Sequence, residues 1–217
     1  MTLAYIHHRV TVTPLQWQAL ADAIRGTGAG ALAAEGAALY GIWRSQIGRP
    51  RDELTVMTVW PGDGASAARA EAILFGDMAA VRACRSERMV PTLRPEGPEP
   101  PRRQGNYAFR WFETPPENWD EFLDLCAGAW PGFESSYDSQ VIGLWRGPDR
   151  DDGSRRSLLM TRRPDLAMWE RSKIPQGPEE VEVRRKLSRR YDLCTWTVVY
   201  TSTLLTADDR EDTERWT

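Results

Sequence analysis

The sequence predicts an α+β protein that is built from two tandem copies of one βαββαβ unit. Two observations support this prediction: the 217-residue chain matches itself at one constant separation, and each half shows the same order of strand and helix patterns. At a separation of 102 residues, Trp17 matches Trp119, and further matches are Tyr5 with Tyr107, Pro14 with Pro116, Arg69 with Arg171, and Gly41-Ile42-Trp43-Arg44 with Gly143-Leu144-Trp145-Arg146. Because these matches need no gap, we infer the duplication of a unit of about 100 residues.

The first copy contains the patterns of four strands and two helices. Residues 3–12 alternate and are rich in β-branched side chains, which predicts a strand. Thr13 and Pro14 suit the cap and first residue of a helix, and Gly26 and Gly28 are expected to end it. Two strands follow at 38–46 and 53–60, joined by a hairpin loop, then an Ala-rich helix at 66–81 and a short edge strand at 88–93.

The second copy repeats this order. The predicted strands are 107–113, 140–146, 156–162 and 194–205, the predicted helices are 118–129, 165–172 and 179–191, and residues 135–139 form a predicted polar loop. A βαββαβ unit is the ferredoxin-like arrangement, a four-stranded antiparallel sheet with helices on one face. We therefore expect tandem ferredoxin-like repeats at 1–97 and 106–205, a Pro-rich linker at 98–105 and a flexible acidic tail at 206–217.

Composition and charge exclude several classes of protein. No apolar run approaches the 18 or so residues of a membrane span, so no membrane partner is expected. The net charge of -3 implies no basic field for nucleic acid. The first nine residues turn polar too early for a secretory signal, and Cys84, Cys126 and Cys194 form no disulfide framework. A cytoplasmic location is the natural expectation.

Several segments carry a resemblance to a known family. The Gly-Ile-Trp-Arg strand, Ile47-Gly48, the strand 54–60 and the terminal Leu93-Arg94-Pro95 resemble the NIPSNAP family, which belongs to the dimeric α+β barrel superfamily. The resemblance implies a fold of the dimeric α+β barrel type. The superfamily also contains cofactor-independent monooxygenases and haem-degrading monooxygenases.

The haem-degrading branch is similar in two short stretches, at residues 8–13 and 58–60. That branch holds the iron with a histidine on a helix, and residues 66–84 contain no histidine. The resemblance therefore favours chemistry without a cofactor over haem, and no metal site is expected.

One candidate site lies in the first copy. His8 and Trp60 are expected on the face of the sheet under the helices, together with Ile6, Val10, Val56 and Thr58. A strand histidine can act as a general base near neutral pH, so His8 and Trp60 are the candidate catalytic residues. His7 points to the opposite face and is a candidate for substrate binding only. Each of these residues can instead be an ordinary core residue.

The other candidate substrate-binding residues are arginines and tryptophans of both copies. Trp43 and Trp145 are equivalent, and Arg44 and Arg146 follow them. The arginines are either paired with a carboxylate or form an anion clamp. In the second copy, Arg110 and Arg162 are expected to replace His8 and Trp60, which predicts the better anion site there.

Two functional hypotheses follow. One is an enzyme, a cofactor-independent monooxygenase or a related oxidation or isomerisation enzyme, that acts on a small apolar or aromatic molecule. The alternative is a non-catalytic module that binds a small ligand or a protein. We expect a homodimer in either case, because exposed sheet edges favour pairing.

Overall fold

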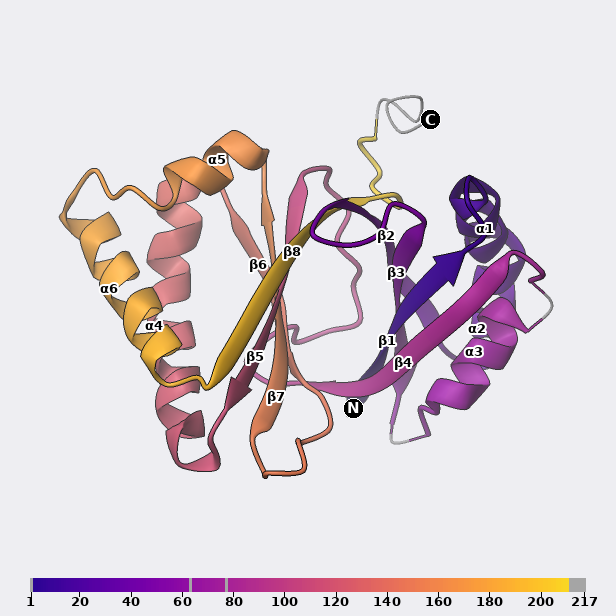
Figure 1. The fold of residues 1–217 in the computed structure, drawn as a ribbon, viewed down its shortest axis with the longest axis horizontal. Helices are drawn as coiled ribbons and strands as arrows, with labels where there is room; N and C mark the ends of the chain where they lie inside the picture. Colours follow the sequence, from indigo (N-terminus) through magenta and orange to yellow (C-terminus); the bar gives the residue numbers. More distant parts are fainter. Residues whose placement is uncertain (1, 63, 77, 211–217) are drawn as a thin grey trace. The chain divides into compact units, whose positions relative to one another are not determined.

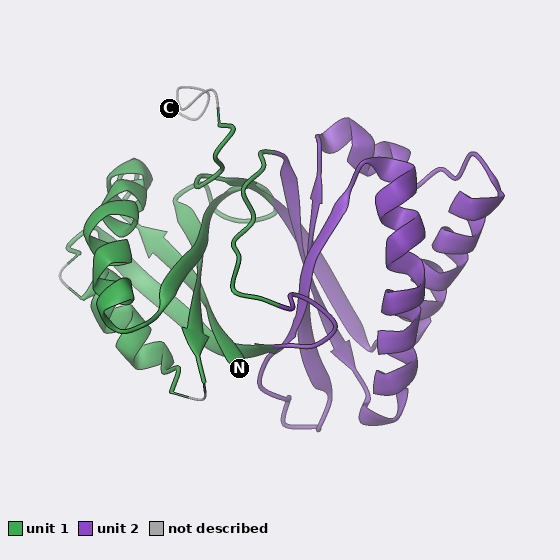
Figure 2. Ribbon diagram, turned by 180° about the vertical axis from the view of Figure 1, so that it is seen from behind, with its two compact units in different colours: residues 1–90, 97–104, 202–217 green, residues 91–96, 105–201 purple. Residues whose placement is uncertain are grey.

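The computed structural model describes residues 2–62, 64–76 and 78–210. The chain divides into two compact units (Figure 2). Unit 1 consists of residues 1–90, 97–104 and 202–217, and unit 2 of residues 91–96 and 105–201. Both units are mixed α+β structures with antiparallel sheets (Figure 1). The predicted acidic tail starts in described residues, but residues 211–217 lie outside them.

The sheet of unit 1 has the strand order β4-β1-β3-β2. Its strands are β1 (Leu3–Val12), β2 (Ala38–Ile47), β3 (Glu53–Pro61) and β4 (Val81–Pro91). Beyond β2 lies the end of β8, where the amide of Leu205 donates to the carbonyl of Ile42 at 2.7 Å. One face is covered by α1 (Trp17–Ala23), the π turn η1 (Ile24–Gly28), α2 (Ala29–Ala34) and α3 (Ala67–Phe75), which pack with the strands into one apolar core.

Several element boundaries in unit 1 differ from the predictions. α1 begins at Trp17 after the N-cap residue Gln16, so Thr13 and Pro14 do not cap and open this helix. Gly26 and Gly28 do not end the helix, which continues to Ala34 through the π turn. Gly28 instead allows close packing, because a Cβ there would lie 3.1 Å from Cδ2 of Leu74 on α3. The predicted helix at 66–81 is α3 alone, and β4 is longer than predicted, beginning at Val81. The many charged residues of β4 hid its strand character.

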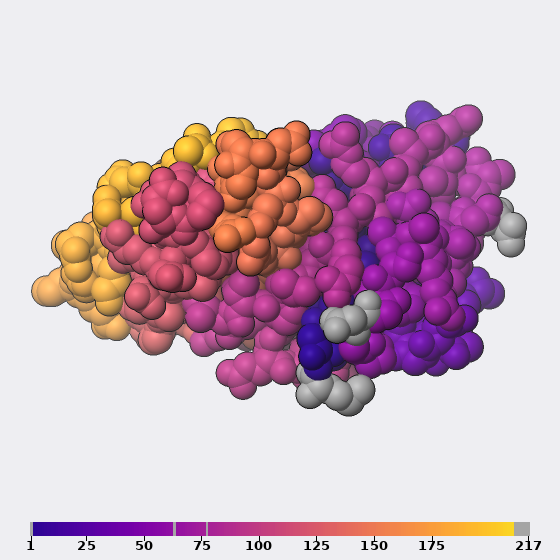
Figure 3. Space-filling model, turned by 90° about the horizontal axis from the view of Figure 1, so that it is seen from below, coloured from indigo at the N-terminus to yellow at the C-terminus, as the bar shows by residue number. Residues whose placement is uncertain are grey.

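Unit 2 has the strand order β8-β5-β7-β6. Its strands are β5 (Asn106–Thr114), β6 (Gln140–Arg146), β7 (Arg155–Arg163) and the first part of β8 (Trp196–Leu204). Residues 91–96 lie beside β6, where the amide of Thr92 donates to the carbonyl of Leu144 at 2.9 Å. The hairpin between β6 and β7 forms part of the surface seen in Figure 3, and its residues 148–152 are exposed.

The helices of unit 2 lie on one side of its strands (Figure 1). They are the short turn η2 (Pro116–Asn118), α4 (Trp119–Tyr137), α5 (Leu166–Arg171) and α6 (Pro178–Asp192). The prediction of a loop at 135–139 is wrong for its first three residues, because α4 runs through Pro131 to Tyr137. Trp130, Phe133 and Tyr137 continue the apolar stripe of α4, and burying them outweighs the hydrogen bond that Pro131 removes.

The two units share an irregularity at matching positions. The pairing of β2 with β3 shifts between Leu39 and Gly41, and that of β6 with β7 between Val141 and Gly143. Each glycine makes room for the tryptophan two residues later, since a Cβ on Gly41 would lie 2.4 Å from Trp43 and one on Gly143 would lie 2.5 Å from Trp145. None of the helices in the described part of the chain has the length and hydropathy of a membrane span.

Candidate functional site

The face of unit 1 that carries His8 is buried, and the His8 ring contacts that of Phe75 on α3, with 5.4 Å between the ring centroids. His8 and Trp60 both point toward the helices, as the alternation of β1 and β3 predicts, and both are buried. His8 Nδ1 lies 2.6 Å from Ser86 Oγ, and Trp60 Nε1 donates to Thr58 Oγ1 at 2.8 Å. Neither residue lines the cavity of unit 2 or the smaller cavity beside Trp17 and Arg25.

The His8 imidazole is held in its neutral form. Burial, followed by the neighbouring His7, lowers the pKa of His8 to about 3. Ligand atoms of His8, Glu71 and Cys84 lie within 4.8 Å of one another, which is close enough to share a metal ion. Burial also raises the pKa of Cys84 to about 11, so its thiol is protonated at neutral pH. A catalytic role for His8 and Trp60 stays a prediction.

The other candidates of the first copy are buried in the strands of unit 1. His7 is buried on the opposite face of β1 from His8. Trp43 is fully buried in β2. Arg44 is also buried, and its guanidinium carbon lies 3.9 Å from the centre of the Trp17 ring.

Three candidates of the second copy, Trp145, Arg146 and Arg162, lie outside the lining of the cavity that Arg110 lines. Trp145 is fully buried in β6. Arg146 forms an ion pair with Asp149 of the same hairpin, with Nη2 2.6 Å from Oδ2, so its partner is local. Arg162 is buried but does not line the cavity that Arg110 lines.

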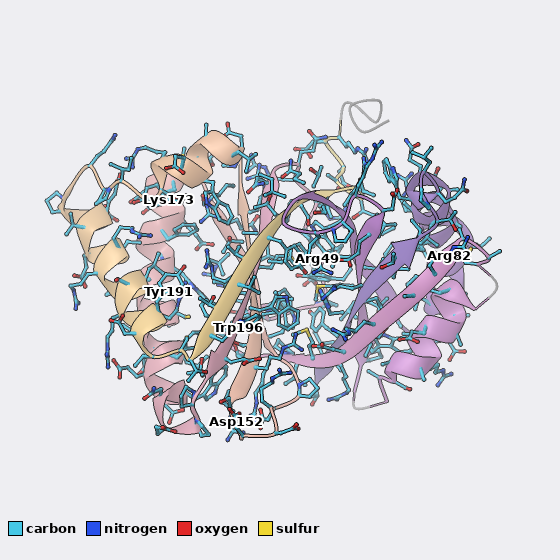
Figure 4. All side chains as sticks on the ribbon, viewed as in Figure 1. Arg49, Arg82, Asp152, Lys173, Tyr191 and Trp196 are labelled. Atoms are coloured by element: carbon cyan, nitrogen blue, oxygen red, sulfur yellow. The ribbon has the colours of Figure 1, made fainter. Side chains whose placement is uncertain are left out.

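That cavity has a volume of about 360 Å³ and lies within unit 2, between the sheet and the helices. Arg110 on β5 and Leu159, Thr161 and Arg163 on β7 form its floor. The helices supply the walls, which consist of Trp130, Phe133, Trp169, Ser172, Lys173, Arg184, Leu187, Arg190 and Tyr191, and Ala108, Val141 and Val199 of the sheet complete the lining. Lys173 beside α5 and Tyr191 on α6 both belong to this helix layer (Figure 4).

Five of the lining side chains are basic: Arg110, Arg163, Lys173, Arg184 and Arg190. Among the described lining residues there is no aspartate, glutamate or histidine. Burial, followed by the charge of Arg110, lowers the pKa of Arg163 to about 10. Burial also lowers the pKa of Arg110. The cavity is therefore a site of positive charge in an apolar setting.

Aromatic rings hold these guanidinium groups in place. The guanidinium carbon of Arg163 lies 4.6 Å from the centre of the Trp169 ring and 5.0 Å from that of Phe133. That of Arg110 lies 5.3 Å from the Tyr191 ring. Cation–π contacts of this kind favour a desolvated cation, and they make the surroundings of the arginines largely aromatic.

The sequence analysis placed Arg162 beside Arg110, but the register of β5 with β7 gives a different arrangement. Ala108 pairs with Thr161 and Arg110 with Leu159, so Arg163, and not Arg162, shares the face of Arg110. Trp43 of β2 pairs with Thr55 of β3, and the equivalent Trp145 of β6 pairs with Leu158 of β7. Equivalent residues of the two units are therefore 102 positions apart up to the β6–β7 hairpin and 103 positions apart after it. Arg163 therefore stands where unit 1 has Trp60.

Comparisons with known proteins show the fold. No family model matches the chain, and no curated protein matches its sequence. One similar solved structure is a candidate monooxygenase from Lactobacillus acidophilus, with a TM-score of 0.61 and 10% identity over 95% of this chain and 98% of that one. A second is an anthrone oxidase-like protein, with a TM-score of 0.57 and 15% identity over 94% of this chain and 91% of that one. A third is a haem-binding protein from Thermus thermophilus, with a TM-score of 0.55 and 16% identity over 94% of this chain and 91% of that one. The chain is thus an α+β protein that shares the fold of these solved structures.

Proposed function

We propose that this protein binds a small aromatic molecule in the cavity of unit 2 and oxidises it with molecular oxygen, without a bound cofactor. The observation that carries the proposal is the cavity itself, in which aromatic walls surround the unpaired charges of Arg110 and Arg163. We further propose that the two units are tandem ferredoxin-like repeats related to the NIPSNAP family. The matching glycine–tryptophan pairs of β2 and β6 support a common origin.

The proposed reaction needs an electron-rich anion. A phenol or enol that loses its proton becomes an anion that can pass electrons to O₂. Arginines aimed at the oxygen of this anion favour the ionised form, as preorganised donors do in an oxyanion hole. We assign this role to Arg110 and Arg163, which both line the cavity, and the released proton passes to water. For an activated methylene group the balance is CH₂ + O₂ → C=O + H₂O, with four electrons moving from carbon to oxygen.

Haem, which one structural neighbour binds, does not fit the residues present. The chain has two histidines, His7 and His8, and both are buried in β1 of unit 1. The described lining of the unit 2 cavity contains no histidine, cysteine or methionine, and its one tyrosine, Tyr191, packs against the guanidinium of Arg110 at 5.3 Å. We therefore derive no step through haem.

A binding module without catalysis is the second candidate function. One observation favours it, since no described lining residue is an aspartate, glutamate or histidine that could act as a general base. The two functions differ in one measurable property, the consumption of oxygen.

An oxygen electrode tests the proposal. The anthrone oxidase-like neighbour suggests an anthrone as the probe, and we expect the purified protein to consume oxygen in step with quinone formation. Arg110→Gln should lower kcat by tenfold or more, because it removes one stabilising donor. Arg185→Gln, which changes an exposed arginine paired with Glu182, is the matched control and should keep full activity.

His8→Gln tests the competing site in unit 1. If turnover is lost in His8→Gln and kept in Arg110→Gln, the unit 2 site is wrong and the first-copy prediction is right. If no variant matters and no oxygen is used, the binding module is the better description. The predicted homodimer is checked separately by light scattering.

A further inference from the structure

The arginines of the unit 2 cavity lack the carboxylate partners that other half-buried arginines of the chain have. Arg94 pairs with Glu134 at 2.8 Å, and Arg171 pairs with Glu180 at 2.6 Å. In contrast, no described aspartate or glutamate forms an ion pair with the cavity arginines Arg110, Arg163 and Arg190. A buried cation without a partner is costly, so this grouping requires an explanation.

The hydrogen-bonding capacity of the cavity is also unbalanced. Nε of Arg163, Nε of Arg190 and Nε1 of Trp130 are buried donors without a hydrogen-bond partner in the protein. All three residues line the cavity. Native proteins satisfy nearly all their buried donors, and a group of orphaned donors around one hollow indicates a ligand that supplies acceptors.

The existing contacts offset only part of this cost. Nη1 of Arg163 donates to Thr161 Oγ1 at 3.0 Å, and Nη1 of Arg190 reaches Cys126 Sγ at 3.6 Å, a weak acceptor. The guanidinium carbon of Arg190 lies 4.8 Å from the centre of the Phe112 ring. Neutral acceptors and ring faces hold each guanidinium in position but leave its charge uncompensated.

We propose that the cavity is built for an aromatic acid, a planar ring system that carries a carboxylate, and that this carboxylate supplies the missing counter-charge to the arginines that line the cavity. A carboxylate is acceptor-only and matches the planar fork of a guanidinium. The flat walls of Trp130, Trp169 and Tyr191 then bind the ring. The inference rests on the proposed function, since it names the class of substrate for the same cavity.

A pair of matched ligands tests the inference directly. The probes are 1-hydroxy-2-naphthoate and its uncharged amide, 1-hydroxy-2-naphthamide, which differ only in the acid group. Calorimetric titration should give a dissociation constant at least tenfold lower for the acid than for the amide. Equal affinities for the two probes, or no binding of the acid, would overturn the inference.

Variants add a readout that an ordinary structural role would not give. Arg163→Met and Arg190→Met should lose at least tenfold affinity for the acid and little for the amide, whereas Arg163→Lys should keep part of the preference. Because each methionine removes an unpaired buried charge, the unliganded variants should unfold at the same or a higher temperature than the parent protein. Arg185→Gln should change neither property.

The outcomes separate this inference from the proposed function. Tight binding of the acid without oxygen consumption supports the inference and contradicts the oxidase. Oxygen consumption with equal affinity for acid and amide supports the oxidase and overturns the inference. The inference would also be overturned if Arg163→Met and Arg190→Met unfold at a lower temperature than the parent protein and still bind the acid more tightly than the amide by the same factor.

Discussion

Acid destabilisation through His8 is a prediction whose size follows from the structure. His8 is fully buried between β1, β4 and α3, facing Ser86, Cys84 and Glu71, and burial lowers its pKa from 6.5 to about 3. A group with a lowered folded pKa contributes stability above the unfolded pKa and loses it as the pH falls toward the folded value. His8 should therefore stabilise the protein fully above about pH 6.5, and its contribution should fall progressively between pH 6.5 and 3.

The expected loss at pH 4 is large. A pH of 4 lies about 2.5 units below the pKa of His8 in the unfolded chain and still above its pKa in the folded protein. At about 1.36 kcal/mol per pH unit, the free energy of unfolding should fall by about 3 kcal/mol. That is a substantial part of the 5–15 kcal/mol that a typical domain has. Cys84 contributes nothing in this range, because a thiol with a pKa of about 11 stays protonated throughout.

Urea unfolding at pH 7 and pH 4 measures the effect. The parent protein should lose about 3 kcal/mol more than His8→Gln between the two pH values, whatever the absolute stability of the variant. Comparing the two losses removes the packing cost of the substitution. If both proteins lose the same amount, His8 is not held neutral by burial and the reasoning about unit 1 is wrong.

Three further predictions concern packing, charge and the cavity. Gly41→Ala should lower the free energy of unfolding by about 1–3 kcal/mol, because the new Cβ would overlap the buried Trp43. Gly30→Ala should raise the free energy of unfolding by about 0.5–1 kcal/mol, because Gly30 lies in a helix with open space around it. Urea unfolding of both variants measures these changes. Glu53→Gln should cost about 3–5 kcal/mol, since it leaves two arginines beside a buried amide, and an unchanged urea midpoint would contradict this. Leu159→Trp should fill the cavity and abolish calorimetric binding of the naphthoate while the circular dichroism spectrum stays that of the parent protein.

Local patterns in the sequence were sufficient to predict most strands and the order of the elements. The Gly-Ile-Trp-Arg and Gly-Leu-Trp-Arg segments marked equivalent strands, because the same close packing of glycine against tryptophan recurs in both units. Two boundaries were not predictable from local rules. Pro131 and Gly28 are usual helix breakers, yet tertiary packing keeps both inside helical segments.

The site was harder to predict than the fold. In β7 both alternating sets of side chains are buried, so hydropathy did not show which set faces the helices. The extra residue in the second hairpin then shifted the alignment of the two copies, and Arg162 was chosen in place of Arg163. Arg190 lies on α6 among many charged residues, and only the structure shows it buried.

The pairing of Leu205 with Ile42 also has a consequence for the order of events during translation. Domains generally fold as units during synthesis, the N-terminal one first. Here the last strand segment of unit 1 is made some 160 residues after β2, which it completes. Until that segment leaves the ribosome, the edge of β2 has no neighbour, and an unpaired edge is a template for association with other chains. The nascent N-terminal half therefore carries an exposed strand edge that the finished chain covers.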